Sequence, residues 1–425
     1  MTEGSIAKNI ILFYIPLAIG GLFQQLYSFV DSVVVGRGIG AQALAAVGAT
    51  SIVVWLTLGF AMGLTRGFCI HISQAYGKKD YHLVNRGFFV ASVLSLIVGA
   101  MISIVGSLAI RDFLILMHTP GEILEQSLGD SSTPFWALLV SSVTNIGLDC
   151  VFVLTLKWGV QGAAAATVLS QVFSFAICAA GLKRLKFVSI LDGSKSKNAR
   201  LTVRMLKTGL PVGIMSMVTA VGGMILQFFV NDLGASAVAA YAASTKIRSV
   251  IGEFSNALGM TFMTFVGQNY GAQKYDRIKA GVRMGVLLSI LIHIPLSAVE
   301  IFGGKRIASL MVTDPPVLEL CRQYLLIVGI FVFFLGFLMV FRNCIQGMGN
   351  TWIPMLSGGL EVFSRLIFGY WLGRHSFMGI AAAEASAWIS VSIMLGSSFF
   401  ILFRKVLRTQ TPENTTDTKN IRTDS

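Results

Sequence analysis

The chain has 425 residues, of which 54% are hydrophobic and only 12% are charged, and its mean hydropathy is +0.74. Soluble domains carry roughly 25% charged residues, so the composition excludes a soluble protein and indicates an integral membrane protein. The formal net charge of +13 does not indicate nucleic-acid binding, because the basic residues lie in short loops between apolar runs. That distribution is typical of loops that stay in the cytoplasm.

Eleven apolar runs are each long enough to cross a membrane as a helix, which takes about 20 residues. Strands of outer-membrane barrels are about half as long, so we expect an all-α protein. In chain order the runs cover residues 10–35, 47–72, 87–110, 133–156, 160–182, 209–230, 239–267, 281–303, 323–341, 352–372 and 379–403. The first run is too long for the core of a cleaved signal peptide and is predicted to be retained. Residues 406–425 are polar and are predicted to form a disordered tail.

The sequence contains no pattern for a disulfide framework, a zinc site or a common catalytic class. Its five cysteines have no paired spacing. The His-Glu-x-x-His, Gly-x-Ser-x-Gly and Walker patterns are absent, and the five histidines are scattered. We therefore expect neither an enzyme nor a cofactor.

A sequence repeat divides the chain into two related halves. Gln-Ala-Tyr-Gly at residues 74–77 returns 194 residues later as Gln-Asn-Tyr-Gly at residues 268–271. Two copies of a helical unit that begin on the same side are the plan of many transporters, whose substrate path lies between the halves. We predict an N-terminal bundle over residues 1–190, a basic cytoplasmic linker over 191–208 and a C-terminal bundle over 209–405.

The two halves differ in length. Leu-Gly-Asp at residues 128–130 matches Met-Gly-Asn at 348–350 with an offset of 220, which is 25 residues more than the offset of 195 found just upstream. In the second half the additional residues form the run at 323–341. The first half is therefore predicted to lack its fourth helix, between about residues 126 and 129.

The absent helix changes the predicted topology. With only two runs between residues 111 and 182, the basic loop at 183–207 would lie on the opposite side of the membrane from the basic loop at 78–86, against the usual distribution. Restoring one span places both loops in the cytoplasm. We infer a parent architecture of six helices per half, of which this chain is a truncated or imperfectly recorded member. Residues 111–130 are expected to form an irregular polar linker in place of the helix.

Two polar residues lie inside the run at 133–156. Asn145 and Asp149 are four residues apart, so their side chains share one helical face. A carboxylate in hydrocarbon costs a few kcal/mol even on the lenient scales, so it is expected to face a bundle interior, a partner or an ion. Asp149 is therefore a candidate site residue, and the alternative is a carboxylate that is only hydrogen-bonded within a bundle.

Together these residues resemble the multidrug and toxic compound extrusion (MATE) family. The resemblance covers nearly the whole chain and rests on Pro16 with the segment 24–31, the two Gln-x-Tyr-Gly motifs, residues 129–134, Asn145 with Asp149, the Gly-Ala run at 162–167, and Gly-Met-Gly-Asn at 347–350. Within the family the chain is most similar to the DinF-like branch. That resemblance implies a cation site formed by Asp31, Asn145, Asp149 and Thr167, and no second acidic site of the kind that the NorM-like branch carries on its seventh and tenth helices.

The resemblance also implies a function. It indicates a cation-coupled antiporter of the cell membrane that exports amphipathic, often cationic drugs by alternating access. We expect a monomer in the lipid bilayer, with its basic loops and both termini cytoplasmic. Two carboxylates with an amide and a hydroxyl suit either Na⁺ or H⁺, and the sequence does not choose between them. The alternatives are a lipid-linked oligosaccharide flippase of similar fold and an inactive truncated remnant.

Other polar residues and methionines within the apolar runs are candidates for lining the drug path, since methionine side chains adapt to varied ligands. These candidates are Gln24, Gln25, Met215, Gln227 and Met260. Packing or lipid contact is the alternative for the methionines.

The remaining charges within the runs have simpler interpretations. Glu361 and Arg365 are four residues apart and are predicted to pair with each other. Arg66 is interpreted as a residue near a helix end whose head group reaches water. Three further acids, Glu253, Glu300 and Glu384, are interpreted as drug contacts or as residues near the membrane surface.

Overall fold

The computed structural model describes residues 1–38, 41–109 and 198–408, together with eight single positions between 144 and 173. Side chains are described throughout this part except within 27–55 and 103–109. All elements in the described part are helical, which confirms the expected all-α fold.

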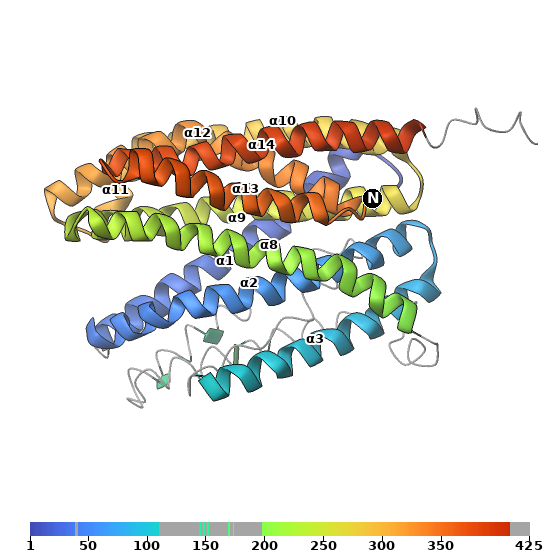
Figure 1. Ribbon diagram of the computed structural model, residues 1–425, viewed down its shortest axis with the longest axis horizontal. Coiled ribbons are helices and arrows are strands. Elements are labelled where there is room, and N and C mark those ends of the chain that lie inside the picture. The colour runs from blue at the N-terminus through green and yellow to red at the C-terminus, as the bar shows by residue number, and fades with distance from the viewer. Residues whose placement is uncertain are drawn as a thin grey trace, which may run out of the picture.

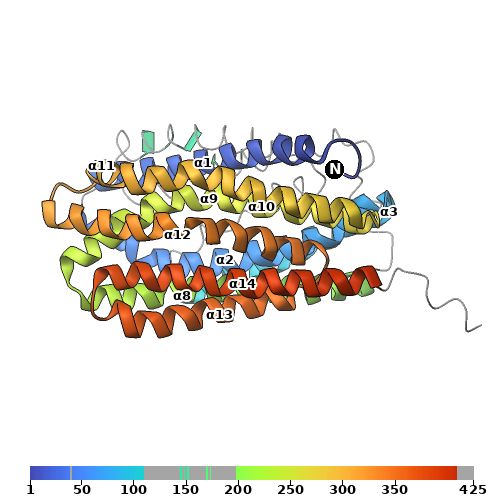
Figure 2. The same ribbon diagram turned by 90° about the horizontal axis from the view of Figure 1, so that it is seen from above.

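The long helices run roughly parallel or antiparallel to one another along the longest axis of the molecule (Figures 1 and 2). In chain order the elements are α1 (Ile6–Gly38), α2 (Ala41–Gly77), α3 (Tyr81–Ala109), α8 (Ala199–Asp232), α9 (Ala235–Gly271), α10 (Tyr275–Ala298), the π-helical turn η3 (Val299–Gly303), α11 (Gly304–Ala308), α12 (Pro315–Gly347), α13 (Trp352–Phe368), the π-helical turn η4 (Gly369–Gly373) and α14 (Phe377–Arg408).

Nine of the eleven apolar runs coincide with these helices, because a chain of this composition satisfies its backbone groups in lipid only by helix formation. Apart from single positions, the runs at 133–156 and 160–182 lie outside the described residues. The predicted missing helix and the tail beyond Arg408 also lie outside them. Among the described residues six helices are long and apolar enough to cross a membrane: Ile6–Leu26, Tyr81–Ile102, Ala199–Asp232, Tyr275–Ala308, Pro315–Gly347 and Phe377–Arg408.

The turns after the two Gln-x-Tyr-Gly motifs have the same geometry. Lys79 and Gln273 occupy matching positions and both have a left-handed backbone, with φ of 61° and 59°. The backbone N–H groups of residues 78, 79 and 80 donate to the carbonyls of residues 74, 76 and 75, and residues 272–274 repeat this pattern. The related sequences therefore end their helices with the same turn, in which a left-handed residue satisfies the last carbonyls.

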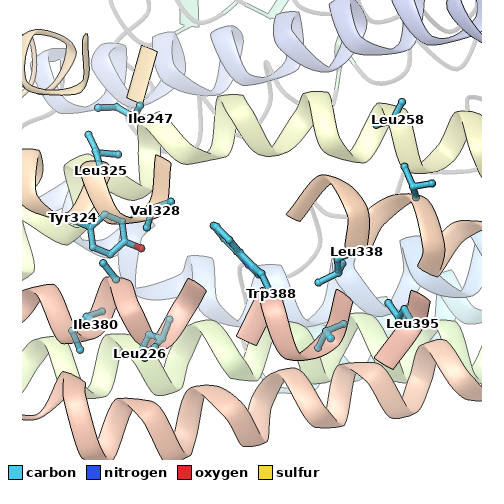
Figure 3. Close-up of a cluster of buried hydrophobic side chains, with 14 of the residues drawn as sticks. Leu226, Ile247, Leu258, Tyr324, Leu325, Val328, Leu338, Ile380, Trp388 and Leu395 are labelled. Atoms are coloured by element: carbon cyan, nitrogen blue, oxygen red, sulfur yellow. The ribbon is translucent and has the colours of Figure 1, made fainter. Parts of the chain in front are cut away.

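The C-terminal half has a continuous hydrophobic core. Trp388 of α14, Tyr324 of α12 and Leu226 of α8 are each at most 1% exposed and point into the space between these helices (Figure 3). This packing joins α8, α9, α10, α12 and α14 into one body.

Helices α2 and α8 cross at close range and join the two halves (Figure 1). Gly59, Gly63 and Gly67 repeat every four residues on α2, and a Cβ on Gly67 would overlap Gly209 of α8. A Cβ on Gly63 would lie 2.6 Å from the Val212 carbonyl oxygen. Small residues at this spacing let helix backbones approach closely in a membrane.

The halves also meet where α2 and α9 end. A Cβ on Gly77 would overlap the Gln268 carbonyl, and a Cβ on Gly271 would overlap the Gln74 carbonyl. The Ser73 hydroxyl donates to the Thr264 carbonyl at 3.2 Å, and the Gln74 amide donates to the Gly347 carbonyl at 2.9 Å. We call this the closed end of the molecule. The far end carries α11, and there α1 and α2 lie away from α8 and α9 (Figure 1).

The first residues of the chain lie across the closed end. The Arg277 guanidinium donates to the backbone carbonyls of Met1, Glu3 and Gly4, and Lys274 donates to that of Thr2. Lys79, from the other half, pairs with the Glu3 carboxylate at 3.3 Å. The N-terminal segment therefore contacts the turns of both halves.

The start of α8 lies at the closed end as well. Arg86 of α3 donates to the Asn198 side chain at 3.0 Å, and the His71 ring lies 3.2 Å from the Arg204 carbonyl. The start of α8 therefore lies beside the turn between α2 and α3.

Candidate functional site

The structure describes only part of the predicted cation site. Asp31 lies on α1, where the backbone alone is described, and Asn145 is helical and fully buried, with 0% exposure. Asp149 and Thr167 lie outside the described residues. The convergence of these four side chains therefore stays a prediction.

Two of the predicted drug-path residues lie where the halves touch. Gln25 is on α1 and hydrogen-bonds to α9, and Met260 of α9 packs with Phe13 and Leu17 of α1. Gln24, one residue earlier on α1, is half-buried.

The other two lie on α8, in the C-terminal half. Met215 is 7% exposed and its sulfur accepts a hydrogen bond from the Gln346 amide at 3.7 Å. Gln227 donates to the Asn231 side chain at 2.8 Å. The structure therefore does not bring these two residues together with Gln25.

A polar cluster of partly buried side chains joins the two halves. The Gln25 amide donates to the Glu253 carboxylate of α9 at 3.1 Å, and Asn256 hydrogen-bonds to the same carboxylate. The Arg66 guanidinium of α2 lies within electrostatic range of Glu253. We call Gln25, Arg66, Glu253 and Asn256 the inter-half cluster.

The interpretation of Arg66 as a helix-end residue is wrong. It lies eleven residues before the end of α2, which is roughly 16 Å along the helix axis, and its Nε atom is buried. The Glu253 carboxylate of the other half attracts its guanidinium. Its sequence context did not reveal this, because the partner is almost 190 residues away.

Glu253 lies at the contact between the halves. A Cβ on Gly21 of α1 would come within 3.1 Å of its carboxylate, so glycine at that position makes room for it. An amide, a carboxylate and a guanidinium from three helices can bind the polar parts of a ligand. Because the Gln25–Glu253 hydrogen bond joins the two halves, it must break if they separate here.

The predicted pairing of Glu361 with Arg365 is confirmed. Arg365 lies 2.9 Å from one carboxylate oxygen of Glu361, and Arg342 of α12 lies 2.9 Å from the other. All three side chains are at most 7% exposed. Arg365 also donates to the backbone carbonyl of Thr219 on α8.

This pair belongs to a larger ionic network inside the C-terminal half. Glu384 of α14 bonds to both Arg248 of α9 and the Tyr324 hydroxyl of α12, and it lies 3.8 Å from Arg365. The Arg248 guanidinium lies over the Trp388 ring, 5.0 Å from its centre. Buried charges are stable only when they are paired and hydrogen-bonded, so this network binds α9, α12, α13 and α14 to one another.

The sequence analysis did not single out three members of the network, Arg248, Arg342 and Tyr324. Arg248 is a charge within an apolar run, a signal that could have found it, whereas a tyrosine such as Tyr324 is common in such runs. Glu384 had been interpreted as a drug contact or a residue near the surface, but it is 3% exposed and paired inside one half.

The family model named MatE matches residues 16–148 and 211–371, which is more than half of the chain. The probable multidrug resistance protein YoeA of Bacillus subtilis (strain 168) is 27% identical, with 89% of this chain and 92% of that protein aligned. YpnP of the same organism, also a probable multidrug resistance protein, is 26% identical over 94% of this chain and 93% of its own length.

A solved structure has the same fold. It is described as the outward-facing conformation of a multidrug resistance MATE family transporter. The two sequences are 22% identical, and the superposition has a TM-score of 0.88 and covers 96% of this chain and 98% of the other. With the family match, the paired halves and the shared motifs, the chain belongs to the MatE family of membrane transporters.

Proposed function

We propose that this protein exports drugs from the cell as a cation-coupled antiporter. One structural observation carries the proposal: the two halves pack closely at the closed end, while at the far end α1 and α2 lie away from α8 and α9 (Figure 1). Alternating access needs such an interface, since one half must rock against the other around a binding site. The names of YoeA and YpnP support multidrug compounds as the exported class.

The charge distribution supports an orientation. Basic residues are concentrated at the closed end, which is typical of the cytoplasmic side. They include Lys78, Lys79, Arg86, Arg200, Arg204, Lys207, Lys274, Arg277, Lys279 and Arg283. We infer that the closed end faces the cytoplasm in the cell membrane and that the described state is sealed on that side.

The coupling site is proposed to lie in the N-terminal half, at Asp31, Asn145, Asp149 and Thr167. Na⁺ or H⁺ bound there must favour one state of the two halves, and the drug must favour the other. Neutralising either carboxylate removes the charge change that links the ion to the drug, while an amide keeps the shape of the side chain.

The test is drug export by a bacterial strain that lacks its own efflux pumps. The wild-type chain is expected to raise resistance to a cationic dye such as ethidium, and Asp31→Asn or Asp149→Asn is expected to abolish the gain at equal abundance in the membrane. Asp232→Asn, on the exposed end of α8, is the control that keeps activity. Export by Asp149→Asn at the wild-type rate would refute the coupling site.

Two further readouts separate the alternatives. In membrane vesicles, a Na⁺ pulse and an acid pulse are applied separately, and the pulse that drives dye movement identifies the coupling ion. If a correctly inserted wild-type chain exports no dye, the protein is an inactive remnant. The predicted absence of the fourth helix is the reason for this alternative.

A further inference from the structure

One carboxylate in the C-terminal half stands apart from the ionic network. Glu300 is 1% exposed, and neither of its carboxylate oxygens has a hydrogen-bond partner in the described part of the chain. It lies on η3, the π-helical turn that continues α10. Such turns shift the helical register and are frequent at functional sites.

The carboxylate lies against α12 where no donor is free. A Cβ on Gly329 would come within 3.4 Å of the Glu300 Oε2 atom, so the helix backbone itself forms the wall. The Gly329 carbonyl accepts a hydrogen bond from the Ser297 hydroxyl at 2.7 Å. Leu325 and Val328, both 0% exposed, supply apolar surroundings on the same helix (Figure 3).

Arg248 is the cation that acts on Glu300, and it is already engaged. Its guanidinium bonds to Glu384 and to the Tyr324 hydroxyl and covers the Trp388 ring. It therefore attracts Glu300 from a distance without donating to it.

The other titratable groups on the elements around Glu300 are also accounted for. On α10, His293 is hydrogen-bonded to the Ser255 hydroxyl at 2.8 Å and to the Ser289 carbonyl at 2.7 Å. On α11, Lys305 pairs with Glu319 at 3.4 Å and Arg306 is exposed. Tyr241 of α9 packs edge-on against the Tyr324 ring.

An ionised carboxylate with no donor in an apolar interior is expensive, whereas the neutral acid is not. A metal cation is a poor match, because hard cations take several oxygen ligands and the described part of the chain has no group of three or more His, Cys, Asp or Glu side chains that could hold a metal ion. We propose that Glu300 is a proton-binding site of the C-terminal half, and that it holds a proton in the state in which the closed end is shut. The proposal deepens the proposed function, because it identifies a second group that could exchange protons during export.

Loss of the proton has a direct consequence for the network. Arg248, Arg342 and Arg365 share two paired carboxylates, Glu361 and Glu384. When the Glu300 acid releases its proton to water, its new negative charge competes with Glu384 for Arg248. Proton release is thereby linked to a change in the contacts that join α9, α12 and α14.

Infrared spectroscopy of the purified full chain tests the site. At about pH 7 the wild type should show C=O stretching absorption of a protonated carboxylic acid, and Glu300→Gln should lose the part of this band that comes from Glu300. Glu319→Gln, at an exposed ion pair, is the control and should keep the band. A band of equal strength in wild type and Glu300→Gln would overturn the proposal.

Thermal unfolding gives a second, independent result. Glutamine copies the size and hydrogen-bonding groups of the neutral acid, so the Tm of Glu300→Gln should equal or exceed that of the wild type, and more so as the pH rises. If Glu300 is instead ionised and balances the arginines, Glu300→Gln should unfold at a lower temperature or fail to fold. Either of these outcomes overturns the proposal.

The link to export is read from the same infrared band. Adding ethidium to the wild type should weaken the Glu300 band, because drug binding favours the state that releases the proton. An unchanged band in a protein that exports ethidium would overturn the role in coupling. A wild type that shows the band but exports nothing would refute the proposed function and leave the proton site standing.

Discussion

The closed end should be sensitive to a single methyl group. In Gly77→Ala the new Cβ would overlap the Gln268 carbonyl and lie within 2.7 Å of its Cα. These neighbours are backbone atoms, so no side chain can move aside and α2 must separate from α9 by about 1 Å to reach ordinary contact. The hydrogen bonds Gln74–Gly347 and Ser73–Thr264 then weaken or break. At about 1 kcal/mol each, their loss disfavours the closed state by about 2 kcal/mol, roughly a 30-fold change in its population relative to the open one.

Spin labels on either side of this contact can measure the change. Lys78 and Lys279 are exposed and belong to different halves, so both can be replaced by cysteine in a background without the native cysteines. Gly77→Ala should shift the interspin distance distribution toward longer values. Gly223→Ala is the matched control, because no atom lies within 4 Å of a Cβ built there. If Gly77→Ala keeps the wild-type distribution and full export, the close approach of α2 and α9 does not control the closed state.

Three further predictions follow from other contacts. Glu361→Gln removes the carboxylate between two buried arginines and should lower the free energy of unfolding by about 3–5 kcal/mol. Thermal unfolding in detergent measures this loss, and an unchanged Tm would contradict the buried network. Arg277→Ala should release the N-terminal segment and raise hydrogen exchange there about tenfold, since a charged hydrogen bond contributes roughly 1.5–3 kcal/mol, whereas Lys279→Ala should not. Cysteines at Lys78 and Lys207 should react with a membrane-impermeant reagent from the same side, and labelling from opposite sides would contradict the shared closed end.

Local patterns in the sequence were sufficient to predict the helices and one ion pair. Apolar runs of spanning length have one stable form in lipid, so nine of them could be predicted as helices. Glu361 and Arg365 could be paired because a spacing of four places side chains on one helical face. The two Gln-x-Tyr-Gly motifs were found as a sequence repeat, and the structure shows that they end in matching turns. Family membership followed from motifs of the same short range.

Contacts between distant segments were decided only by the tertiary structure. Arg66 was misinterpreted, and Arg248 was not singled out, because their partners Glu253 and Glu384 lie on other helices and no spacing rule relates them. Glu300 could not be recognised as lacking a partner until every neighbouring donor had been placed. Burial and charge pairing depend on which helix faces pack together, and that arrangement is set by the crossing of α2 with α8 and by the core of the C-terminal half. Spacing along the chain determines which residues share a helix face, whereas only the packing of helices determines what that face meets.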